Sequence, residues 1–91
     1  MTEQEIQEFG QALAERFKQV GDEMVSTALK YMDARNDKSI KRLDLLVLEL
    51  QKDKAFSIFE TWSEVTDLLP LEIKRVFVEH LEKIKKTEDQ L

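Results

Sequence analysis

The scarcity of turn-forming residues constrains this chain more than any other feature. Only two glycines and one proline occur in 91 residues, whereas a β-rich fold needs such residues at each of many tight turns. Hydrophobic residues make up 42% of the chain and charged residues 36%, a combination that suits amphipathic helices with one buried and one hydrated side. The sequence therefore predicts an all-α fold, and its length predicts a single helical domain over residues 1–91.

The first helix is predicted over residues 3–34. Thr2 and Glu5 form a capping box at its start. Apolar residues then recur at spacings of three and four, which keep one side of a nearly straight helix apolar. These positions are Ile6, Phe9, Leu13, Phe17, Val20, Met24, Ala28 and Tyr31. Gly21 followed by Asp22 leaves two short helices as the alternative, but the apolar pattern passes through without a change of phase and favours one helix.

The segment Asn36-Asp37-Lys38-Ser39 is the clearest turn in the chain, because such residues hydrogen-bond their own backbone. A second helix is expected over residues 38–52, with Asp37 or Ser39 as its N-cap. This helix is apolar on two sides and must therefore be covered from two directions. Ile40, Leu43, Leu46, Val47 and Leu50 lie on one side, and Leu45 and Leu48 lie on another.

Two further helices are expected over residues 54–68 and 70–87. Lys52-Asp53-Lys54 indicates a connection before the first of them, and Pro70 suits the first position of the other, where its missing amide hydrogen costs nothing. The predicted architecture is a helical bundle of three or four antiparallel helices. Because the shorter helices would cover only about half of a first helix that is ~48 Å long, we expect dimerisation to complete the bundle.

The charge balance disfavours nucleic acid as a partner. The formal net charge is −5, whereas affinity for nucleic acid comes largely from basic residues that neutralise phosphates. No apolar run approaches the roughly 20 residues of a membrane span, so no membrane association is expected. The start Met1-Thr2-Glu3 lacks the basic and apolar regions of a signal peptide, which leads us to expect a cytoplasmic protein.

No combination of residues points to catalysis, a cofactor or a metal site. The chain has no cysteine, which leaves no thiolate nucleophile or ligand. His80, the single histidine, has the chemistry of a phosphoacceptor or general base, but an ordinary helical position beside two glutamates is the favoured interpretation. Residues 33–44 have the length of a calcium-binding loop, but Arg35 stands in place of an oxygen ligand and Lys38 in place of the turn glycine, which favours a simple turn.

Two sets of residues remain as candidate contact surfaces. The apolar side of the first helix is the expected self-association or partner face, formed by Ile6, Phe9, Leu13, Phe17, Val20 and Met24. Glu60, Glu64 and Asp67 form an acidic stripe at helical spacing, either a hydrated face or a contact for a basic partner. The aromatic residues Phe56, Phe59, Trp62 and Phe77 fit a core better than a ligand pocket.

These observations predict a non-enzymatic helical protein that acts by protein–protein interaction, as a homodimeric regulator, inhibitor or chaperone-like adaptor. One alternative is a helical domain that binds an apolar small molecule between Trp62 and the phenylalanines. The other is an acidic inhibitor that mimics nucleic acid and occupies the basic groove of another protein. Binding by such a mimic would weaken as salt rises, whereas binding through an apolar face would tolerate salt.

Overall fold

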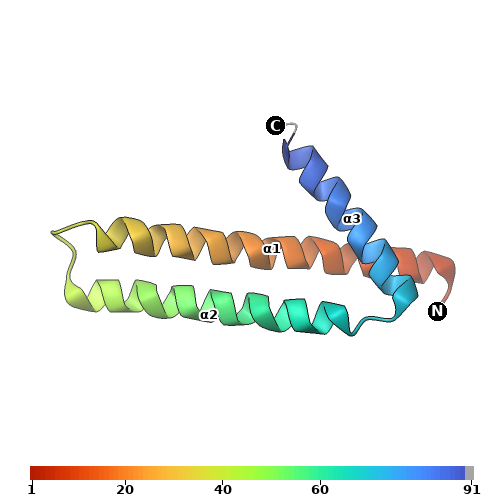
Figure 1. The fold of residues 1–91 in the computed structure, drawn as a ribbon, viewed down its shortest axis with the longest axis horizontal. Coiled ribbons are helices and arrows are strands. Elements are labelled where there is room, and N and C mark those ends of the chain that lie inside the picture. Colours follow the sequence, from red (N-terminus) through yellow and green to blue (C-terminus); the bar gives the residue numbers. More distant parts are fainter. Residues whose placement is uncertain (90–91) are drawn as a thin grey trace.

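Three helices follow one another in the computed structural model, which describes residues 1–89. Helix α1 spans Glu3–Arg35, α2 spans Arg42–Asp67 and α3 spans Leu71–Asp89. Helices α1 and α2 form a long antiparallel hairpin, and α3 crosses α1 obliquely (Figure 1). The all-α class is confirmed. The arrangement is nevertheless a hairpin with one crossing helix, rather than a bundle in which all helices are antiparallel.

Helix α1 is continuous through Gly21, as the apolar pattern predicted. Its start is held by the expected capping box, in which the Glu5 amide donates to Thr2 Oγ1 and the Thr2 amide donates to Glu5 Oε1, each at 3.2 Å. Gly21 does not adopt a positive φ, and that left-handed conformation is what allows a glycine to end a helix. A glycine with helical geometry leaves the hydrogen-bond ladder intact.

The start of α2 differs from the predicted position at residue 38. The Asp37 carboxylate accepts hydrogen bonds from the amide and hydroxyl of Ser39, at 2.9 and 2.7 Å. These bonds hold the pKa of Asp37 below its usual value. Both candidate N-caps are thus used within the turn, and the helix begins only after Lys41.

The predicted connection at residues 52–54 is wrong, because α2 passes through it without a break. The segment contains no glycine or proline to interrupt the helix. The Lys52 ammonium lies 4.5 Å from the centroid of the Tyr31 ring in α1 and 3.5 Å from the Asp53 carboxylate. The charged residues that suggested a loop instead lie on a helix that accompanies α1, so α2 covers more of α1 than two shorter helices would.

Lys41 occupies the N-cap of α2 with extended backbone angles, φ −72° and ψ 143°, but its side chain makes no capping hydrogen bond. An aspartate there would accept from a first-turn amide and favour the helix dipole. We expect Lys41→Asp to raise the free energy of unfolding by about 1 kcal/mol in urea denaturation. Lys38→Asp makes the same charge change inside the turn and should alter the free energy of unfolding by less than about 0.5 kcal/mol. Equal gains from both would contradict capping as the cause.

Small residues occupy the places where the helices meet. The buried residues are Gly10, Ala14, Thr27, Ala34, Ala55, Thr66, Ile73 and Phe77. A Cβ atom at Gly10 would lie 2.6 Å from Cγ1 of Val76, so the absence of a side chain allows α3 to cross α1 at close range. Within residues 1–89, no large side chain is fully buried. The contacts between helices are therefore close but narrow.

An aromatic cluster joins the three helices. The ring centroid of Phe17 lies 5.4 Å from that of Phe59 in α2 and 5.6 Å from that of Phe77 in α3, with the second pair edge-on. Such geometries favour the interaction of the ring edges with neighbouring faces. Phe77 is buried and Phe59 is half-buried in this cluster. Trp62 is also half-buried, and Phe56 is exposed.

Candidate functional site

The part of the hairpin near the α1–α2 turn lies beyond α3 (Figure 1) and carries a concentration of exposed apolar side chains. Their exposed fractions lie between 46% and 70%. On α1 they are Val25, Leu29 and Met32, which we call the α1 face. On α2 they are Leu43, Leu46, Val47 and Leu50, which we call the α2 face.

The α1 face continues the side of α1 on which α3 lies. Lys18 marks the end of the covered part, because its ammonium hydrogen-bonds Asp22 at 2.7 Å and contacts Glu88 of α3. The hydrogen bond to Asp22 raises the pKa of Lys18 most, and the hydrogen bond to Glu88 raises it further. Val25 follows Lys18 by seven residues, which is two helical turns, and therefore projects from the same side. The surface that receives α3 thus extends past the end of α3 without a covering element among the described residues.

The α2 face points away from α1. Phe59 contacts Phe17 of α1, and it follows Leu50 by nine residues, or two and a half helical turns. Leu50 and its three companions are therefore on the side of α2 opposite the hairpin interface. The sequence had indicated that this helix is apolar on two sides, and the structure assigns the half-buried side of Leu45 and Leu48 to the contact with α1.

The molecule exposes far more surface than a compact chain of its mass. Its accessible area is 7287 Å², whereas area–mass scaling gives about 5,500 Å² for a compact monomer of this size. Its radius of gyration is 16.9 Å, against about 12 Å for a compact domain of this length. The excess of roughly 1,800 Å² reflects the elongated shape, with principal extents of 56, 29 and 15 Å.

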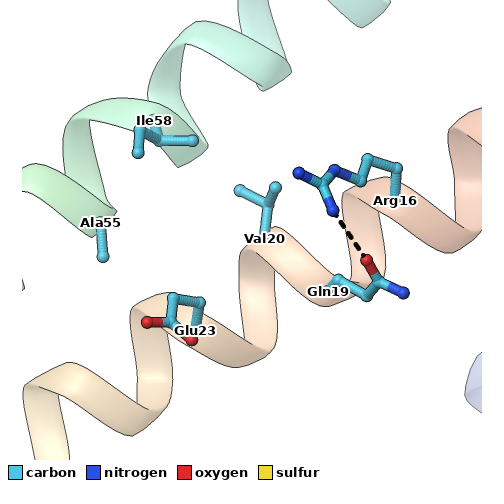
Figure 2. A pocket seen from close by; sticks show the side chains of 6 residues that line it. All are labelled: Arg16, Gln19, Val20, Glu23, Ala55 and Ile58. Carbon is cyan, nitrogen blue, oxygen red and sulfur yellow. Dashed lines mark hydrogen bonds between the residues drawn. The ribbon is translucent and has the colours of Figure 1, made fainter.

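The six residues predicted as a self-association face lie along α1, and several of them contact other helices of the same chain. Phe17 packs in the aromatic cluster, and Val20 points toward Ile58 of α2 (Figure 2). Ile6, Leu13 and Met24 are half-buried, and Phe9 is 44% exposed. The sequence prediction did not include the α1 face, because Val25, Leu29 and Met32 form only a short apolar row, at spacings of four and three, beside the longer stripe through Met24.

A hollow of about 350 Å³ lies between α1 and α2 (Figure 2). It is lined by Arg16, Gln19, Val20, Glu23, Ala55 and Ile58. Arg16 donates a hydrogen bond to Gln19 Oε1 at 3.1 Å across its rim. Trp62 borders a separate hollow on α2. The rings that the small-molecule alternative would place around one ligand are therefore divided between the aromatic cluster and a different surface.

The polar candidates are dispersed. Glu60, Glu64 and Asp67 are all exposed, as expected for their side of α2, and Asp67 Oδ1 lies 3.9 Å from the Lys74 ammonium. His80 is half-buried on α3, with Nε2 3.7 Å from Glu15 Oε1. In the part of the chain that the structure describes, no three histidine, aspartate or glutamate side chains gather closely enough to hold a metal ion. None of the helices formed by residues 3–89 is both long and apolar enough to cross a membrane.

No protein-family model matches the chain, and neither a curated protein nor a solved structure shows significant similarity to it.

Proposed function

We propose that this chain is a non-enzymatic protein that acts by protein–protein interaction, as a small regulator, inhibitor or chaperone-like adaptor, and that it works as a homodimer. The observation that carries the proposal is the excess of accessible surface together with its apolar character at the turn end of the hairpin. Exposed apolar patches of this kind are typical of contact surfaces for other proteins. The two faces lie on opposite sides of the hairpin, which suits a protein that holds two partners at once.

The α1 face is proposed as the surface for a different protein, and its partner is an amphipathic helix. The support is its continuity with the surface that α3 already occupies. Helix α3 contacts α1 through Ile73, Val76 and Phe77, an apolar row at helical spacing. A partner helix with a similar row would extend the same packing along Val25, Leu29 and Met32. In this mode of binding, an amphipathic helix is recognised through apolar residues at spacings of three and four.

The test is partner capture with a matched pair of variants. Proteins retained by the immobilised chain are identified by mass spectrometry, purified and titrated against the wild type, Leu29→Glu and Lys30→Glu. We expect Leu29→Glu to raise the Kd at least tenfold, because it places a charge in an apolar contact. Lys30→Glu makes a larger change of charge than Leu29→Glu, but at an exposed neighbouring position. It should therefore change the Kd by less than about twofold.

The salt dependence adds a second criterion. Binding through the α1 face should survive an increase from 0.1 to 1 M NaCl, because apolar contacts are not screened. A retained protein whose affinity collapses with salt would instead support the acidic mimic, in which surfaces such as Glu60, Glu64 and Asp67 meet a basic groove. Retention that does not distinguish Leu29→Glu from Lys30→Glu would contradict the proposed use of the α1 face.

A further inference from the structure

We propose that the α2 face is the homodimer interface and that two copies pair across it in antiparallel orientation, with a two-fold axis between Leu46 and Val47. This inference rests on the self-association in the proposed function and identifies the surface responsible. The occupant of the α2 face is then a second α2, which leaves the α1 face of each copy free for a different protein.

The first support is that the α2 face has the geometry of a short helix–helix seam. Leu43, Leu46 and Leu50 follow one another at spacings of three and four, and Val47 broadens the row. This is the spacing that lets side chains of one helix interdigitate with those of another. Because the row points away from α1, a second helix can pack on it without displacing the hairpin.

The second support is charge complementarity of the α2 face with itself. Arg42 lies at the start of one flank of the row, and Glu49 lies on the same flank seven residues later. In an antiparallel pair the same flanks meet with their directions reversed, so Arg42 of each copy lies within two residues, about 3 Å along the helix axis, of the level of Glu49 of the other. Two-fold symmetry repeats this contact at both ends of the seam. Exposed ion pairs contribute little affinity, but they select orientation.

The position of Lys54 favours the antiparallel arrangement over the parallel one. It follows Leu50 by four residues and lies in line with the apolar row. A parallel pair in register would place the two Lys54 side chains next to each other in line with the apolar row, at one end of the seam, which is unfavourable. An antiparallel pair centred on Leu46 and Val47 places Lys54 beyond the start of the other α2, which begins at Arg42, and so keeps the two lysines apart.

The chain as a whole has enough excess accessible surface for this assembly. A protein–protein interface of standard size buries about 800 Å² on each partner. The excess accessible surface of this chain, roughly 1,800 Å², corresponds to about two such contacts. One dimer contact on the α2 face and one partner contact on the α1 face would together bring the accessible area close to that of a compact protein.

The first experiment measures solution mass by light scattering after size exclusion, over a hundredfold range of concentration. The wild type is expected at twice the chain mass of 10.7 kDa. Leu46→Glu should raise the dimer dissociation constant at least a hundredfold, whereas Leu29→Glu, the same substitution on the α1 face, should change it less than threefold. Circular dichroism confirms that both exposed-site variants retain their helices.

The second experiment uses the absence of cysteine in the chain. A disulfide requires Cα atoms within about 7 Å, and seven residues of helix span about 10.5 Å. In the antiparallel pair, Leu43→Cys should therefore not cross-link with itself, whereas a mixture of Leu43→Cys and Leu50→Cys chains should form the disulfide between unlike chains under mild oxidation.

Each outcome has one meaning. A wild type that stays monomeric at every concentration overturns the homodimer and this interface with it, while the partner titration with Leu29→Glu still decides the interaction function independently. If the Leu46→Glu variant is still a dimer, the chain does self-associate, but the α2 face is not the interface. Cross-linking of Leu43→Cys with itself overturns the antiparallel pairing in favour of the parallel one.

Discussion

Replacing Phe17 by alanine is expected to lower the free energy of unfolding by about 3 kcal/mol or more. Phe17 is the ring shared by both aromatic pairs, with centroid distances of 5.4 and 5.6 Å, so its removal loosens α2 and α3 from α1 together. Each pair contributes roughly 0.5–1.5 kcal/mol beyond the burial of its surface. Urea denaturation followed by circular dichroism, at one fixed chain concentration, measures the loss.

Phe9→Ala is the matched control for this substitution. Phe9 lies on the same helix eight residues earlier and is 44% exposed, so its truncation should cost less than about 1 kcal/mol. A loss at Phe17 no larger than that at Phe9 would contradict the central position of the cluster. The comparison also bears on the six-residue face predicted from the sequence, because a variant at Phe17 would lose stability before it reported on association.

Gly10→Ala and Gly21→Ala are expected to change stability in opposite directions. In a helix interior, alanine is favoured over glycine by roughly 0.5–1 kcal/mol. At Gly10 the added Cβ would lie 2.6 Å from Val76 Cγ1 and 2.8 Å from Val76 Cβ. Because neither the Val76 Cβ nor the α3 backbone can turn away as a flexible side chain would, α3 must shift. We expect a net loss of about 1–2 kcal/mol.

At Gly21 the new Cβ meets only the edge of the Phe59 ring, at 3.7 Å. That distance is an ordinary van der Waals contact, so the helix preference of alanine should prevail and stabilise the protein by about 0.5–1 kcal/mol. Thermal and urea denaturation of both variants under identical conditions provide the comparison. Stabilisation by both substitutions would show that α3 does not cross α1 as closely as the structure indicates.

The sequence predicted the elements better than their arrangement. The capping box at Thr2 and the unbroken phase through Gly21 are local signals, and both led to the correct first helix. Lys52-Asp53-Lys54 was misleading because charged residues occur in exposed turns and on exposed helix sides alike. The contact of Lys52 with Tyr31 joins residues distant in the sequence, and no local pattern reveals it.

For the candidate surfaces too, the local pattern was evident from the sequence but the long-range packing was not. The two-sided apolar character of residues 40–50 was evident from spacing alone, and it pointed to a helix that needs cover on both sides. Which side faces α1 depends on how the two helices pack, and small residues such as Ala55 are buried beside α1. The α1 face is apolar in the sequence as well, but its exposure depends on how far α3 reaches along α1, and Glu88 of α3 contacts Lys18.

The uneven cover of the hairpin has a consequence for how the fold opens. Near Gly10 and Phe17 three helices are packed together, whereas among residues 1–89 only α1 and α2 form the turn end of the hairpin. Opening free energies in a protein follow the local density of buried contacts. The backbone amides at the turn end therefore exchange with solvent through smaller and more frequent openings than those beside α3. The segment that we propose to contact partners is thus less protected than the part beside α3, and its ordering on association would be part of the free energy of binding.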